Sequence, residues 1–107
     1  MPRADALCHY VIVRADIPRG LQAAQIVHAA GESSPGNLPE GTHAVVLQVS
    51  DEARLRAAAA RLVLAGVPHV RVVESGAPHV GELMALGLLP ARKEVLRRHV
   101  SSLPLLR

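Results

Sequence analysis

Aromatic side chains are almost absent from this sequence. Phe and Trp do not occur, and Tyr10 is the single aromatic residue among 107, although half of the residues are hydrophobic. Alanine, valine and leucine must therefore fill the core, and each of them buries little area. Close approach of helix to sheet, or a partner subunit, would help such a core to reach ordinary stability. We therefore expect a homodimer.

Cysteine and long apolar runs are also scarce. The one cysteine, Cys8, cannot form an internal disulfide framework, which favours a reducing compartment. No segment approaches the roughly 20 apolar residues that cross a bilayer, and no basic start joined to an apolar run indicates a signal peptide. These features predict a cytoplasmic protein that does not bind membranes.

Several classes of chemistry lack their usual residues. There is no Gly-x-Ser-x-Gly elbow, no P-loop and no dinucleotide-binding glycine pattern, so acyl-serine, nucleotide and redox chemistry are not indicated. One cysteine is too few for a structural zinc site, and five histidines show no pair at metal-ligand spacing: His9, His43, His69, His79 and His99. We expect neither a metal nor a cofactor.

Charge of one sign is in modest excess. The net charge is +3 and is carried almost wholly by arginine. Guanidinium groups pair bidentately with phosphate, which favours an anionic partner. A charge of this size also keeps many small proteins soluble, so the composition alone is compatible with both interpretations.

The order of predicted elements indicates one α/β domain over residues 1–107. β-Branched runs predict strands, helix formers between breakers predict helices, and a loop rich in Gly, Pro and Ser covers residues 32–42. The expected strands are 8–14, 44–49, 69–74 and 82–88, and the expected helices are 19–30, 51–65 and 91–100. Helical crossovers favour parallel strands, whereas the third and fourth strands are close enough along the chain to pair antiparallel. A mixed sheet with helices on its faces follows.

We expect Gly31 to follow the end of the first helix and Ser50 to cap the second. Apolar residues share one face of the first helix: Ala23, Ile26, Val27 and Ala30. Leu21, Gln25 and His28 then lie on the opposite side, away from the core. This stripe is either an ordinary solvent-facing surface or part of a site. The start of the helix, Pro18-Arg19-Gly20, combines free N–H groups with a guanidinium and suits a phosphate, although many surface helices begin this way.

Two segments carry a resemblance to a known family. Residues 10–30, YVIVRADIPRGLQAAQIVHAA, resemble the N-terminal signature of type 2 peptidyl-tRNA hydrolases, in which a strand ending Arg-x-Asp-Leu leads through a Gly-Lys turn to Ala-Ala-Gln-x-x-His-Ala. Residues 74–90, ESGAPHVGELMALGLLP, resemble the second signature more loosely. Strand order and length agree over nearly the whole chain.

The resemblance implies a three-layer α/β/α fold around a four-stranded mixed sheet, a homodimer, no metal, and hydrolysis of the ester that joins a peptide to the 3′ end of tRNA. Five residues match the first signature: Arg14, Asp16, Gly20, Gln25 and His28. Four positions depart from the family pattern: Leu21 stands in place of the signature lysine, Glu74 replaces the aspartate, and Pro78 and Met84 replace threonines.

The candidate catalytic residues are Gln25, His28, Glu74 and Asp16, and the candidate substrate-binding residues are Arg14, Arg19, Gly20 and Leu21. Glu74 is suited to orienting water, Gln25 or a backbone N–H to holding an oxyanion, and His28 to proton transfer. Three functions remain open: hydrolysis of peptidyl- or aminoacyl-tRNA, non-catalytic binding of tRNA or protein, and hydrolysis of another ester or amide. A basic last helix suits RNA in either of the first two.

Overall fold

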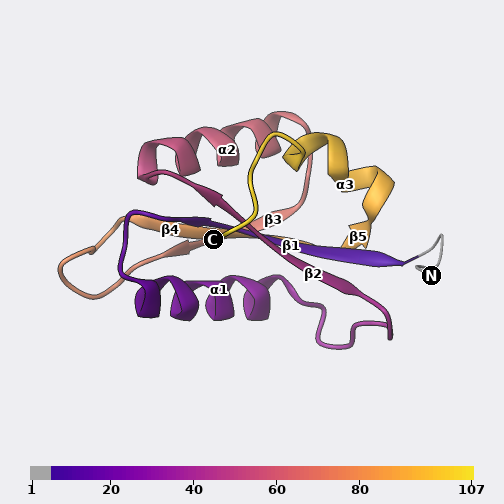
Figure 1. Ribbon diagram of the computed structural model, residues 1–107, viewed down its shortest axis with the longest axis horizontal. Helices are drawn as coiled ribbons and strands as arrows, with labels where there is room; N and C mark the ends of the chain where they lie inside the picture. The colour runs from indigo at the N-terminus through magenta and orange to yellow at the C-terminus, as the bar shows by residue number, and fades with distance from the viewer. Residues whose placement is uncertain (1–5) are drawn as a thin grey trace.

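The computed structural model of the chain describes residues 6–107 (Figure 1), and the first five residues of the expected domain lie outside this range. The strands are β1 (Leu7–Arg14), β2 (His43–Val49), β3 (His69–Val73), β4 (Leu83–Leu88) and β5 (Ala91–Arg92). The helices are α1 (Arg19–Ser33), α2 (Glu52–Leu64) and α3 (Lys93–Val100). All seven predicted elements are present, and β5 is an addition that the sequence pattern did not predict.

The four main strands form one mixed sheet in the order β2-β1-β4-β3. β1 and β2 are parallel, as the helical crossover between them predicted, and β4 runs antiparallel to both β1 and β3. The two residues of β5 pair antiparallel with the start of β1. The predicted α/β class and mixed sheet are therefore confirmed.

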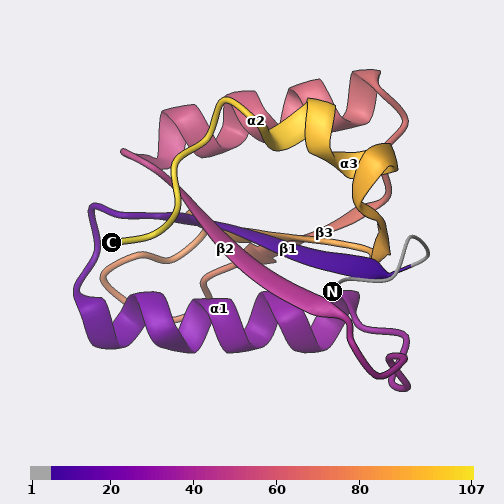
Figure 2. The ribbon, with the colours of Figure 1, turned by 45° about the vertical axis from the view of Figure 1, so that its right-hand side comes forward.

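Helices cover both faces of this sheet. α1 lies on one face, and α2 and α3 lie on the other (Figures 1 and 2). The α2 and α3 side holds the larger core, in which Leu55, Leu62, Leu86, Leu88 and Leu96 are buried. The three-layer arrangement implied by the family resemblance is confirmed.

α1 approaches the sheet closely because small residues meet at the contact. A Cβ atom added to Gly87 of β4 would clash with the carbonyl oxygen of Ala29 and with Ser33 Oγ. Ser33 Oγ donates to the Ala29 carbonyl oxygen at 2.6 Å and is 2.7 Å from Nε2 of buried His9 on β1. On this side, a core without Phe or Trp is thus filled by the close approach of the α1 backbone to the β4 backbone.

Three predicted helix boundaries were wrong. α3 begins at Lys93 rather than Ala91, because Ala91 and Arg92 pair with β1 as β5. α1 passes through Gly31 and ends at Ser33, because Gly31 keeps a helical backbone and Ser33 is anchored to β1 through His9. The N-cap of α2 is Asp51 rather than Ser50, and its carboxylate accepts the backbone N–H of Arg54 at 2.9 Å. Capping by an aspartate satisfies a free amide and also suits the positive end of the helix.

The C-terminal tail pairs with the outer edge of β2. Leu106 N donates to Val46 O at 2.9 Å, and Gln48 N donates to Pro104 O at 3.0 Å. The tail therefore covers one end of the sheet, whereas β3 forms the other end. Across residues 6–107, no helix is long and apolar enough to pass through a membrane.

Candidate functional site

A polar cleft lies between α1 and the outer strand β3. It has a volume of about 370 Å³, and its lining combines one stripe of α1 with the end of β3 and the two residues that follow it: Gln25, His28, Glu32, Arg71, Val72, Val73, Glu74 and Ser75. Three of the four predicted catalytic residues, Gln25, His28 and Glu74, therefore meet in this cleft although they lie up to 49 positions apart.

The carboxylate of Glu74 is held by three hydrogen bonds at one end of the cleft. Gln25 Nε2 donates to Oε2 at 3.0 Å, while the backbone N–H groups of Ser75 and Gly76 donate to Oε1 at 2.9 and 3.2 Å. These donors, with Gly76 contributing most and Ser75 next, lower the pKa of Glu74 below its usual value. The side chain is thus an ionised acceptor fixed in one orientation.

His28 lies on α1 next to this carboxylate. It lines the same cleft, its side chain is exposed, and its positive charge when protonated makes a smaller contribution to the lowered pKa of Glu74. The imidazole is therefore accessible to a substrate that enters the cleft. The interpretation of Leu21, Gln25 and His28 as a merely solvent-facing stripe is therefore wrong for Gln25, which is only 4% exposed.

The predicted division of α1 into an apolar and a polar face was also wrong in its details. The residues buried against the sheet are Gln22, Gln25, Ala29 and Ser33. Val27, expected in the core, is 71% exposed, and Ala23 is exposed as well. Gln22 is buried because its Nε2 donates to the carbonyl oxygens of Ala15 and Ile17 in the turn before the helix. Backbone acceptors in that turn thus favour an amide over an apolar side chain.

Arg14 and Asp16 form a separate ion-pair cluster. Arg14, buried at the end of β1, donates to both carboxylate oxygens of Asp16 at 2.7 and 2.9 Å and to Glu82 Oε1 at 2.7 Å. Hydrogen bonding to Asp16, and then to Glu82, raises the pKa of Arg14, and the same contact with Arg14 lowers the pKa of Asp16. His79 Nδ1 lies 3.0 Å from the same Glu82 oxygen. Neither Arg14 nor Asp16 lines the cleft, and their charges satisfy one another.

The other three predicted substrate-binding residues occupy the first turn of α1. Arg19 and Gly20 are exposed and Leu21 is half-buried, and none of the three lines the cleft. Arg19 Nη2 donates to the backbone oxygen of Arg107 at 3.4 Å, so the first turn of α1 contacts the C-terminal tail. The structure therefore separates this group from Glu74.

Sequence reasoning missed Glu32 and Arg71, which also line the cleft. Glu32 lies one helical turn beyond His28, and Arg71 lies three residues before Glu74. Extending the Gln25 and His28 stripe by one more turn would have found Glu32 if the helix had not been ended at Gly31. Arg71 carries no comparable signal, because its place in the cleft depends on β3 lying at the end of the sheet.

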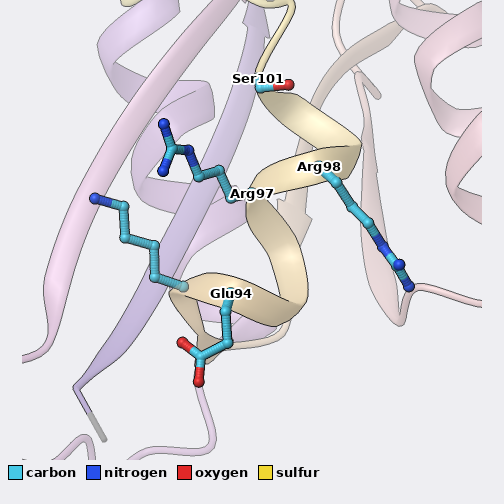
Figure 3. Close-up of a pocket in the computed structure, with 5 residues that line it drawn as sticks. Glu94, Arg97, Arg98 and Ser101 are labelled. Atoms are coloured by element: carbon cyan, nitrogen blue, oxygen red, sulfur yellow. The ribbon is translucent and has the colours of Figure 1, made fainter. Parts of the chain in front are cut away.

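A second, basic hollow lies on the opposite face of the sheet. It has a volume of about 560 Å³ and is lined by residues of α3 and its end: Lys93, Glu94, Arg97, Arg98 and Ser101 (Figure 3). Arg97 and Arg98 extend in opposite directions from α3. Two parts of the chain were predicted to bind phosphate: the start of the first helix, with Arg19, and the basic last helix. They lie on opposite faces of the sheet, because α1 covers one face and α3 covers the other.

Metal ligands do not gather in either hollow. Within the part of the chain that the structure describes, no group of three His, Cys, Asp or Glu side chains is placed to hold a metal ion. The polar side chains of Gln25, His28, Glu74 and Ser75 bring amide, imidazole, carboxylate and hydroxyl groups to the lining of the cleft.

Comparison with known proteins identifies a family and solved structures of related fold. The model of the family described as Peptidyl-tRNA hydrolase PTH2 matches residues 7–106. A solved structure from Agrobacterium tumefaciens, described as a protein of unknown function, is similar with a TM-score of 0.58 and 15% sequence identity, covering 94% of this chain and 98% of that chain. At that identity the likeness shows the fold alone. No curated protein matches the sequence.

Proposed function

Because the chain belongs to the peptidyl-tRNA hydrolase PTH2 family, we propose that it hydrolyses the ester between a peptide and the 3′ end of tRNA in the cleft between α1 and β3. The observation that carries this proposal is the fixed carboxylate of Glu74, which accepts from Gln25 and from two backbone N–H groups. Such an acceptor is preorganised and needs no reorientation during a reaction.

In this mechanism Glu74 orients a water molecule rather than acting as a strong base, because its lowered pKa weakens it as a proton acceptor. The water oxygen attacks the ester carbonyl carbon while His28 takes the water proton. The second N–H of the Gln25 amide is available to the developing oxyanion. When the bond to the ribose oxygen breaks, His28 returns the proton to that oxygen, and the products are a free peptide acid and tRNA.

The signature lysine is replaced by Leu21, so this position in the first turn of α1 carries no positive charge. Non-catalytic binding of tRNA or protein, and hydrolysis of a different ester or amide, are therefore the rival functions. Single-turnover hydrolysis of N-acetyl-peptidyl-tRNA by the wild-type protein separates them. Release of peptide at a rate above that of buffer supports the proposal. Tight tRNA binding without release favours the binding function, and absence of both favours another substrate.

We propose that α3 contributes to RNA binding through phosphate contacts, since Lys93, Arg97 and Arg98 surround a hollow of suitable charge. A base-stacking surface is not expected, because Tyr10 is buried in the core. An RNA bound in the cleft must extend around the edge of the sheet to reach α3, because the two surfaces lie on opposite faces.

We also propose that the protein is a homodimer. The α1 side of the core is small, and apolar side chains remain exposed at the end of α2, where Leu64 is 88% exposed and Val63 is 58% exposed. Light scattering at low micromolar concentration should give about twice the chain mass of 11.3 kDa. A mass equal to one chain would remove this proposal without affecting the proposed chemistry.

A further inference from the structure

The wall of the cleft includes a free strand edge. β3 lies at the end of the sheet, and nothing within residues 6–107 pairs with its outer side. The opposite end, β2, is covered by the C-terminal tail. A free edge presents a row of backbone N–H and C=O groups that can pair with another extended chain.

The strand register shows which backbone groups point outward. Leu89 N donates to Pro68 O, so Pro68 and Leu89 form a hydrogen-bonded pair of the antiparallel ladder. Such pairs alternate along the strand, so Val70 and Val72 bond to β4 in the same way. The N–H and C=O groups of Arg71, between these two residues, therefore face away from β4.

The outward pattern continues through the irregularity that follows Val72. Glu74 N donates to Glu82 O at 3.0 Å, so Glu74 is again bonded toward the β4 side. Val73 lies between two inward-bonding residues and points its N–H and C=O outward. Arg71 and Val73 are both cleft-lining residues, and they are about 7 Å apart along an extended strand.

The cleft also has a direction. Gln25 contacts Glu74 at one end, and the α1 stripe continues through His28 to Glu32 while the β3 lining continues back to Arg71. Seven helical residues and three strand residues each span about 10 Å, so the two walls match in length. A chain whose ester lies at Glu74 would extend along β3 toward Arg71.

We propose that the free edge of β3 binds the peptide part of the substrate as an added, parallel strand, with the ester at Glu74 and the preceding residues opposite Val73 and Arg71. This inference rests on the proposed function and names the part of the substrate that the cleft recognises. Main-chain pairing is independent of peptide sequence, which suits an enzyme that must accept any nascent peptide. It also favours peptidyl-tRNA over aminoacyl-tRNA, because a single amino acid offers too short a backbone to pair.

Amide hydrogen exchange tests the pairing directly. The probe is a CCA-ended oligonucleotide whose 3′-amino group carries N-acetyl-tetraalanine through an amide bond, which is not an ester and therefore resists hydrolysis by this chemistry. Binding should slow exchange of the Arg71 and Val73 amides at least tenfold. The Val72 amide, already bonded to β4, is the internal control and should change little. Equal effects on all three amides, or no effect, would overturn the proposal.

A substitution pair tests the same contact from the protein side. Arg71→Pro removes the outward N–H, and proline is tolerated on an edge strand where that group faces away from the sheet. Arg71→Ala removes only the side chain and keeps the N–H. Affinity for the probe should fall about tenfold more in Arg71→Pro than in Arg71→Ala, the effect of leaving one hydrogen-bonding group unpaired. Equal affinities in two folded variants would contradict main-chain pairing.

N-Methylation of the probe covers the case in which Arg71→Pro does not fold. Blocking successive peptide N–H groups one at a time should weaken binding at alternate positions only, because a paired strand presents every second residue to its neighbour. A uniform effect overturns the pairing. Slow hydrolysis of peptidyl-tRNA together with this alternation would reject the proposed function but support peptide binding at the β3 edge. Fast hydrolysis without alternation would support the proposed function but reject peptide binding at the β3 edge.

Discussion

The two faces of the sheet are built from different residues. Under α2 and α3, buried leucines fill a continuous apolar core. Under α1, the apolar cluster consists of Val11, Val13, Ala29, Val72 and Ala85, and polar groups are buried beside it. The α1 face therefore offers less apolar area and more hydrogen-bonding groups to the same four strands.

This difference assigns separate tasks to the two faces. Large aliphatic side chains on the α2 and α3 side supply most of the apolar burial, so the α1 side can hold Gln25 and Ser33 with their polar partners. The cleft occurs on the face where stability depends least on apolar packing. Substitutions under α2 and α3 should accordingly change the free energy of unfolding, whereas substitutions in the cleft should change the rate of hydrolysis.

The largest effect on stability is expected from Leu55→Ala on α2. Leu55 is fully buried in the leucine core, and truncation leaves a cavity that costs about 3–4 kcal/mol in the free energy of unfolding. Urea unfolding measures the change. Arg54→Ala on the same helix is the control, since its exposed side chain should contribute less than about 0.5 kcal/mol. Equal losses would contradict the placement of the core.

Arg14→Met should cost about 2 kcal/mol, because Asp16 and Glu82 would lose the guanidinium that neutralises them while both remain partly hydrated. The pKa of Asp16 is lowered in the folded chain, so its contribution is complete above the ordinary Asp pKa and is lost as pH falls through the lowered value. Unfolding measured from neutral to acidic pH should show a shallower loss in Arg14→Met. Parallel curves would mean that the cluster does not stabilise the fold.

Leu21→Lys should raise peptidyl-tRNA hydrolysis by less than about tenfold. A well-placed charge donor contributes about 2–4 kcal/mol in other acyl-transfer sites, but Leu21 lies outside the cleft lining, so a lysine there reaches Glu74 poorly. Adding Gln25→Ala should remove the gain if both residues act at one site. A gain of hundredfold or more would show that the first turn of α1 belongs to the reacting centre.

The smallest effect is expected from Arg97→Ala on α3. If Arg97 contacts a phosphate, the slope of log affinity for tRNA against log salt concentration should become shallower by about 0.7 to 0.9, with affinity lowered equally for different sequences. Glu32→Ala in the cleft should change this slope little, since it removes no positive charge. An unchanged slope in Arg97→Ala would exclude α3 from the RNA contact.

Much of the fold was predictable because local patterns and long-range packing agree. The strand at 8–14 and the helix with Leu55, Ala58, Ala59 and Leu62 have one dominant period each, and both were correctly predicted. Gly31 was misleading because its effect as a helix terminator was outweighed by the hydrogen bond between Ser33 and His9. Only the tertiary structure brings that pair together.

The lining of the cleft was predictable in part from the sequence, and its boundaries were not. Gln25, His28 and Glu74, three of the four candidate catalytic residues, line the cleft, whereas the fourth, Asp16, is paired with Arg14. A signature records which residues occur together and does not separate those that touch substrate from those that fix a turn. Arg71 was missed because its strand lies at the edge of the sheet only through the order of the strands, which local sequence patterns do not reveal.

We propose that Glu74 acts in catalysis, whereas its neighbour Glu82, across the same turn, stabilises the fold. The measurement is single-turnover hydrolysis of N-acetyl-peptidyl-tRNA by Glu74→Gln and Glu82→Gln, each with its free energy of unfolding. We expect Glu74→Gln to lose roughly hundredfold or more in rate with little loss of stability. Glu82→Gln should keep its rate and lose stability, because Arg14 and His79 lose the negative charge of the carboxylate that they share. Equal rates in the two variants would contradict the assignment of the cleft as the active site.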